Sequence, residues 1–140
     1  MKILLAVDGS PYTKKMLAYL VTHGETFGGN NSFTLFTVQP AVPPRARAAL
    51  GKAVVDQYQL DEAERILAPV AKFLVRHGID AKSAWKVGHA GEMIAKFADA
   101  GKYDLLVMGS HGHGALGNLV MGSVATKVLA HCKVPTLLVR

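Results

Sequence analysis

Short apolar runs alternate along this chain with longer segments in which apolar residues recur every three or four positions. Most of the short runs are rich in Val, Ile, Leu and Phe, which predicts β-strands, whereas the longer period predicts amphipathic helices. The predicted strands span 2–7, 32–38, 80–87, 104–109 and 135–139. The predicted helices span 11–27, 56–77, 91–100 and 122–131.

Serine and proline positions refine the ends of these elements. Ser10 is expected to cap the first helix through its side chain. The proline-rich stretch 39–44 is predicted as a loop, and the pattern assigns no element to 45–55. Pro69 lies inside the long helix 56–77, so we expect it to kink that helix or divide it into two pieces.

The alternation of apolar strands with helices predicts an α/β fold. Continuous apolar strands are typical of a mostly parallel sheet that is covered by helices on both faces. Right-handed crossovers then give a doubly wound, five-stranded domain over 1–140. A ligand crevice is expected at the carboxyl ends of the strands, where Asp8, Val38 and Gly109 lie.

Composition and charge narrow the classes of protein. Half of the residues are hydrophobic, and no apolar run approaches the roughly 20 residues of a membrane span. The net charge is +6, but the basic residues are scattered, which indicates solvated helix faces and not a nucleic-acid surface. The apolar run at 3–7 is interrupted by Asp8 and reads as a strand, not a signal peptide. A lone cysteine, Cys132, favours a reducing cytoplasm.

A glycine-rich stretch from Gly109 to Ser123 leaves a predicted strand and enters the last predicted helix. Glycine lets backbone N–H groups approach a phosphate, and a helix N-terminus favours negative charge. The chain has no acidic residue after Asp104, which also suits a polyphosphate. The stretch therefore predicts a phosphorylated ligand, in the first place a nucleotide.

Two widespread nucleotide motifs fit this stretch only in part. Gly112-x-Gly114-x2-Gly117 has the dinucleotide spacing, but it follows the fourth predicted strand and lacks the acidic residue about 20 positions on. Gly117-x4-Gly122-Ser123 has the P-loop spacing, except that Ser123 stands where the lysine must be. A Rossmann dehydrogenase and a P-loop NTPase are both disfavoured.

A third spacing, Gly109-x2-Gly112-x9-Gly122-Ser123, fits without exception. It is the nucleotide signature of the ATP-binding branch of the universal stress protein family, which this chain resembles over its whole length. The resemblance implies an adenine nucleotide alpha-hydrolase-like fold. It also covers the opening 1–10, the strand end Thr37-Val38, the stretch 107–112 and the closing Val134-Pro135-Thr136-Leu137-Leu138-Val139.

For the base and ribose of ATP, the resemblance implies four contacts. Asp8 would face the nucleotide near the ribose and phosphates. Val38 would offer its backbone to the adenine edge. Met108 and Gly109 would line the base and the ribose. ADP or AMP could take the same place.

For the phosphates, the resemblance implies that Gly112, Gly122, Ser123 and Val124 hold them through backbone N–H groups and the Ser123 hydroxyl. Ser123 is also expected to cap the last helix, and His111 is expected to flank the phosphates. Mg²⁺ would bridge the phosphates, for which one carboxylate with phosphate oxygens and waters suffices.

Several of these residues have a purely structural alternative. Asp8 suits an Asx-turn or a helix cap, and Gly109 and Gly112 suit ordinary turns. His111 and His113 point to opposite sides of an extended loop, and no further ligands complete a tetrahedral zinc site.

The last predicted strand, 135–139, is apolar and forms an edge of the sheet. An exposed apolar edge invites aggregation unless it is covered. The resemblance implies that its copy covers it across a two-fold axis, in a homodimer.

These observations predict a nucleotide-dependent regulatory module in the stress response, acting on a protein client that the sequence does not identify. Asp8 is the sole acid near the loop and no arginine finger is evident, so any ATPase activity is expected to be weak. Two alternatives stay open: a slow ATPase or self-phosphorylating enzyme, and a nucleotide-free dimeric interaction protein.

Overall fold

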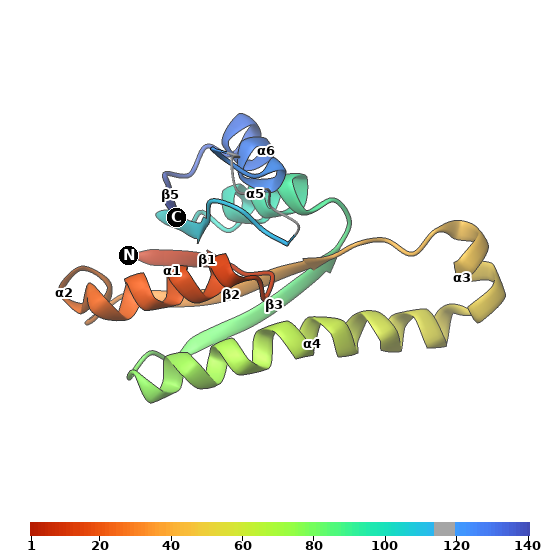
Figure 1. The fold of residues 1–140 in the computed structure, drawn as a ribbon, viewed down its shortest axis with the longest axis horizontal. Coiled ribbons are helices and arrows are strands. Elements are labelled where there is room, and N and C mark those ends of the chain that lie inside the picture. Colours follow the sequence, from red (N-terminus) through yellow and green to blue (C-terminus); the bar gives the residue numbers. More distant parts are fainter. Residues whose placement is uncertain (114–119) are drawn as a thin grey trace.

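The computed structural model describes residues 1–113 and 120–140 (Figure 1). Strands and helices alternate as the hydrophobic pattern predicts. The strands are β1 (Lys2–Ala6), β2 (Ser32–Gln39), β3 (Ala81–Val87), β4 (Leu105–Gly109) and β5 (Thr136–Val139). The helices are α1 (Pro11–Thr22), α2 (Gly24–Phe27), α3 (Pro44–Leu50), α4 (Lys52–Arg76), α5 (Ala90–Ala100) and α6 (Ser123–His131).

The five strands form one sheet in the order β3-β2-β1-β4-β5, and every pairing in it is parallel. The chain winds outward from β1 to β3 on one side and then from β4 to β5 on the other. The doubly wound prediction is confirmed, and the winding reverses between β1 and β4. Parallel α/β sheets bind ligands at the carboxyl ends of the strands beside such a reversal.

Each face of the sheet carries its own apolar core, because neighbouring strand residues point to opposite faces. Ile3 and Leu5 of β1 face the cluster formed with α1 and α4, whereas Leu4 faces the cluster formed with α5 and α6. These three side chains are fully buried, and each burial contributes roughly 1.5–3 kcal/mol. Phe36 and Phe97 stack in the second cluster with ring centroids 4.1 Å apart.

The segment 45–55, to which the pattern assigned no element, is helical. Helix α3 begins at Pro44, inside the predicted loop 39–44, because proline suits the first turn of a helix. Gly51, at φ +86°, separates α3 from α4. Every residue of α3 has a partly or largely exposed side chain, so its sequence lacks the buried stripe that identifies a helix.

Helix α4 runs without interruption through Pro69, so the predicted division into two pieces is wrong. Pro69 lies on the exposed side of the helix. The opposite side carries a buried stripe that holds both halves against β2 and β3. The residues of that stripe are Val55, Gln59, Ala63, Leu67, Val70 and Leu74.

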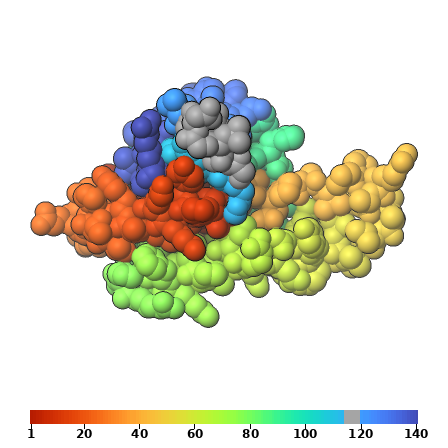
Figure 2. All heavy atoms as spheres, in the orientation of Figure 1, coloured from red at the N-terminus to blue at the C-terminus, as the bar shows by residue number. Residues whose placement is uncertain are grey.

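Helix α3 and the first turns of α4 extend beyond the sheet as an arm (Figures 1 and 2). Leu50, Val54 and Tyr58 are more than half exposed on this arm. Within the described ranges, none of the helices combines the length and the apolar character that crossing a bilayer requires.

Candidate functional site

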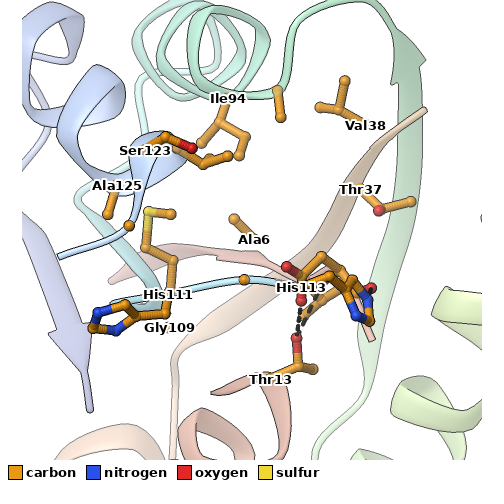
Figure 3. A pocket seen from close by; sticks show the side chains of 17 residues that line it. Ala6, Thr13, Thr37, Val38, Ile94, Gly109, His111, His113, Ser123 and Ala125 are labelled. Carbon is orange, nitrogen blue, oxygen red and sulfur yellow. Dashed lines mark hydrogen bonds between the residues drawn. The ribbon is translucent and has the colours of Figure 1, made fainter. Parts of the chain in front are cut away.

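A cavity of about 350 Å³ lies at the carboxyl ends of β1, β2 and β4 (Figure 3). The N-terminal turns of α1, α5 and α6 complete its wall, so six elements distant in sequence meet there. The nine residues singled out from the sequence all line it: Asp8, Val38, Met108, Gly109, His111, Gly112, Gly122, Ser123 and Val124.

Eight further residues line the cavity without having been predicted as site residues: Ala6, Val7, Thr13, Thr37, Ala90, Ile94, His113 and Ala125. Their contribution depends on tertiary packing. In the sequence, Ile94 looks like an ordinary core residue of α5. It reaches the cavity only because α5 packs against β2. One sequence feature could have indicated a member of this group, because Thr37 lies beside Val38 at a strand end.

Asp8 is fixed at the end of β1 by hydrogen bonds to the start of α1. Its Oδ1 accepts from the backbone N–H of Ser10 at 2.9 Å and from the Thr13 hydroxyl at 3.0 Å. The Asp8 N–H in turn donates to Thr13 Oγ1 at 3.2 Å. The Asx-turn, which was the structural alternative for Asp8, is present, and Asp8 lines the cavity as well, so the two interpretations of this residue are compatible.

The prediction that the Ser10 side chain caps α1 is wrong. Ser10 occupies the cap position, but its hydroxyl makes no capping hydrogen bond. The Asp8 carboxylate takes over the local hydrogen bonding by accepting from the Ser10 N–H.

Gly109 ends β4 where α1 passes closest to the sheet. A Cβ built on Gly109 would lie 2.6 Å from Tyr12 Cβ and 3.2 Å from the Tyr12 carbonyl carbon and oxygen. The distance of 2.6 Å is shorter than real Cβ contacts and the distances of 3.2 Å are tight, and these neighbours belong to the first turn of α1, which cannot move freely. Gly109 is therefore required by packing, whatever it does for a ligand.

Gly112 and Gly122 bring two backbone segments to the cavity wall. A Cβ on Gly112 would lie 2.6 Å from Asp8 Oδ2, and one on Gly122 would lie 3.0 Å from His111 Cα. The Gly122 N–H donates to Ser110 O at 2.8 Å, which closes the wall at the end of β4. These glycines keep side-chain atoms away from the place where a ligand would touch the backbone.

Helix α6 points its N-terminus into the cavity. Gly122 occupies the cap position and Ser123 is the first helical residue, so the prediction that Ser123 caps this helix is wrong. Ser123, Val124 and Ala125 form the first turn and line the cavity. The N–H groups of a first turn have no partner within their own helix and carry the positive end of the helix dipole.

The two histidines hold the stretch after β4 in place. His111 Nδ1 lies 2.7 Å from Ser110 Oγ, and the His111 ring lies 4.8 Å from the Tyr12 ring, centroid to centroid. His113 Nε2 lies 2.8 Å from the Asp8 carbonyl oxygen, a contact that requires an Nε2–H donor. Gly114 and Gly117, part of the two disfavoured motifs, fall outside the described residues.

The cavity has an apolar end and a polar end. Val38, Ile94 and Met108 form the apolar end, whereas Asp8 and the first turn of α6 form the polar end. Among the described lining residues, Asp8 is the only acid and there is no Lys or Arg. An anion held here would depend on backbone N–H groups and the α6 dipole.

The fold and this cavity define a doubly wound, parallel α/β domain with a cleft at the carboxyl ends of its strands, and the sequence comparisons identify the family. The model of the universal stress protein family matches residues 1–140, and the chain belongs to that family. A universal stress protein of Thermus aquaticus is 32% identical over 139 residues, covering 99% of this chain and 97% of the relative.

Another relative is longer than this chain. Universal stress protein Slr1230 of Synechocystis is 31% identical over 140 residues; the match covers 99% of this chain but 42% of the relative. The chain thus spans less than half the length of that protein.

Solved structures share the fold. The MJ0577 protein of Methanocaldococcus jannaschii superposes with a TM-score of 0.78 at 25% identity, covering 99% of this chain and 94% of that one. An Archaeoglobus fulgidus universal stress protein in complex with dAMP gives 0.68 at 19% identity, covering 100% and 98%. An Arabidopsis thaliana family member with AMP bound gives 0.71 at 16% identity, covering 99% and 90%.

Proposed function

We propose that this protein binds an adenine nucleotide, namely ATP or else ADP or AMP, in the cavity at the carboxyl edge of the sheet. The observation that carries the proposal is the juxtaposition of an apolar end with a helix N-terminus that glycines leave accessible. The apolar end suits an aromatic base, and the helix N-terminus suits phosphates.

The proposed ligand lies across the ends of three strands. The phosphates contact backbone N–H groups of Gly112, Gly122 and Val124 and the hydroxyl of Ser123, with His111 at their flank. This part of the site follows β4, which neighbours β1 in the sheet.

The nucleoside half lies toward β2. Asp8 follows β1 and faces the ribose, Met108 and Gly109 line the base and ribose, and the backbone of Val38 meets the adenine edge. One protein of this fold has been solved with AMP bound and another in complex with dAMP, which supports an adenine nucleotide as the ligand.

Mg²⁺ is proposed to accompany the phosphates. Asp8 is the one carboxylate of the described lining residues, and its Oδ2 faces Gly112, on the phosphate side. One carboxylate together with phosphate oxygens and waters fits the usual protein binding of Mg²⁺. The described lining residues include no Lys or Arg that could neutralise the phosphate charge. A bound Mg²⁺ ion would supply that positive charge.

We propose that the site retains its nucleotide and hydrolyses it slowly at most. The protein would then have a regulatory role, in which the bound nucleotide alters the surface that a client protein contacts. Phosphoryl transfer needs a group that positions the attacking water and strong cations on the transferred group. Asp8 Oδ1 is already engaged by Ser10 and Thr13. Any hydrolysis is therefore expected to be slow.

Small molecules released from freshly purified, heat-denatured protein test this proposal by mass spectrometry. We expect an adenine nucleotide at close to one molecule per chain. Ser123→Ala is the matched variant, because it removes one hydroxyl from an exposed helix position and should lower occupancy without unfolding the protein.

An empty protein that also binds no added ATP or AMP would overturn the nucleotide proposal. Release of ADP and phosphate faster than exchange of bound ATP, in a single-turnover experiment, would instead favour the slow ATPase.

A further inference from the structure

The hydroxyl of Thr37 is buried in the cavity wall without a hydrogen-bond partner. Thr37 is 1% exposed, and its Oγ1 makes no hydrogen bond. Figure 3 shows this oxygen turned toward the interior of the cavity and the methyl group turned away. A buried hydroxyl without a hydrogen-bond partner lowers the stability of the folded protein. Such a group beside a ligand-sized cavity therefore indicates that a ligand supplies the missing partner.

Ser10 provides an internal comparison. In the part of the chain that the structure describes, Ser10 and Thr37 carry the buried side-chain hydroxyls without a partner. Ser10 does not line the cavity, whereas Thr37 does. A ligand in the cavity can therefore satisfy Thr37, and it leaves Ser10 as it is.

The position of Thr37 in the sheet indicates which half of a nucleotide it meets. Thr37 lies near the end of β2, and the phosphate end of the site follows β4. The order β2-β1-β4 separates them by two strand spacings, about 10 Å. Asp8, after β1, lies between them, so Thr37 faces the nucleoside half of a ligand whose phosphates sit at α6.

Resting on the proposed function, we propose that the Thr37 hydroxyl hydrogen-bonds the nucleoside half of the bound nucleotide and contributes to its selection. A threonine hydroxyl donates one hydrogen bond and accepts others, so it can serve a ring nitrogen, an exocyclic amine or a ribose hydroxyl. The phosphates take no part in this contact.

Thr37→Val tests the proposal, because valine keeps the shape and strand preference of threonine and removes the hydroxyl. Titration calorimetry with AMP, ADP and ATP is expected to show a five- to tenfold weaker Kd, by about the same factor for all three nucleotides. Ser123→Ala is expected to give the opposite pattern, with a loss that grows from AMP to ATP.

The partner atom follows from the same titration with 2′-deoxy-ATP. A loss that persists with this ligand assigns the contact to the base or the remaining ribose hydroxyl, and a loss that vanishes assigns it to the 2′-hydroxyl. Both outcomes support a nucleoside contact.

Ser10→Ala is the control for removing a buried hydroxyl, and its affinities should match those of the wild type. Thr37→Val should melt no lower than the wild type in the absence of ligand, since it loses no hydrogen bond. Unchanged affinity in Thr37→Val, or a loss that depends on the number of phosphates, would overturn this inference alone. A wild-type protein that binds no nucleotide would overturn the proposed function and this inference with it.

Discussion

At the scale of single residues, the glycines of the site serve packing before they serve a ligand. Gly109 admits Tyr12 at the start of α1, and Gly122 admits the backbone of His111. Gly112 differs, because the atom it would displace is the end of the Asp8 side chain. Substitutions at these positions should therefore affect stability and binding to different degrees.

Gly109→Ala is expected to destabilise the protein by about 1–3 kcal/mol, because the new methyl group would overlap Tyr12 Cβ and the Tyr12 backbone. Urea unfolding followed by circular dichroism measures this. Gly24→Ala is the matched control, since nothing lies within 4 Å of its Cβ and stability should not fall. Equal stability of the two variants would contradict this assignment of Gly109.

Cys132 is expected to be a slow nucleophile. Burial raises the pKa of its thiol, and the nearby Asp99 carboxylate raises it further. Since the folded state holds this proton more tightly, the contribution of Cys132 to stability falls as the pH rises from the ordinary thiol pKa through the raised one. Alkylation by iodoacetamide should be several-fold slower than in the denatured chain and reach half its maximum at higher pH.

Asp99→Asn sharpens the test of Cys132. Asparagine removes the carboxylate charge but keeps an oxygen for the N–H of Lys133, which now donates to Asp99 Oδ1 at 3.0 Å. This variant should alkylate faster than the wild type. Native protein that reacts as fast as denatured protein would contradict the raised pKa.

At the scale of elements, α4 shows how tertiary packing overrides local preference. Its buried stripe extends on both sides of Pro69, so contacts with β2 and β3 outweigh the hydrogen bond that proline removes. The exposed position of Pro69 means that no packing depends on its ring.

Pro69→Ala is therefore expected to stabilise the protein by about 1–3 kcal/mol, because it restores a backbone donor and removes the clash of the ring with the preceding turn. The midpoint of urea unfolding measures the gain. Ala68→Gly, at the neighbouring exposed position, should lower stability by about 1 kcal/mol. A loss of stability in Pro69→Ala would show that the helix needs the proline.

At the scale of the whole molecule, β5 is an edge strand with half of its backbone groups turned outward. Leu106 and Ser110 donate to the carbonyl oxygens of Pro135 and Val139, so these residues face β4. Thr136 and Leu138, which alternate with them, direct their backbone groups to the open edge. This edge is where the predicted homodimer would pair.

Leu138→Pro is expected to convert a dimer into a monomer, because proline removes an outward N–H and does not touch the hydrogen bonds to β4. Sedimentation velocity measures the oligomeric state. Leu138→Ala keeps the N–H and should remain dimeric, so a difference between the variants separates strand pairing from side-chain packing. A wild-type monomer at micromolar concentration would contradict the dimer.

The alternation of apolar runs and helical periods, read from the sequence alone, predicted the α/β class, the position of every strand to within a few residues and the edge on which the site lies. This succeeded because the inner strands of a parallel sheet are covered on both faces and are therefore apolar, and because the carboxyl ends of parallel strands meet at one edge. The glycine spacing, together with the family resemblance that it carries, likewise named nine residues that line one cavity.

Only the tertiary structure decided the continuity of α4, the helical state of 45–55 and which groups cap α1 and α6. It also decided that Thr13, Thr37 and Ile94 line the cavity. These outcomes depend on which groups meet in the folded chain. Burial of apolar side chains against distant strands, for example, can keep a helix continuous across a proline. A side chain becomes part of a cavity only when other elements close around it.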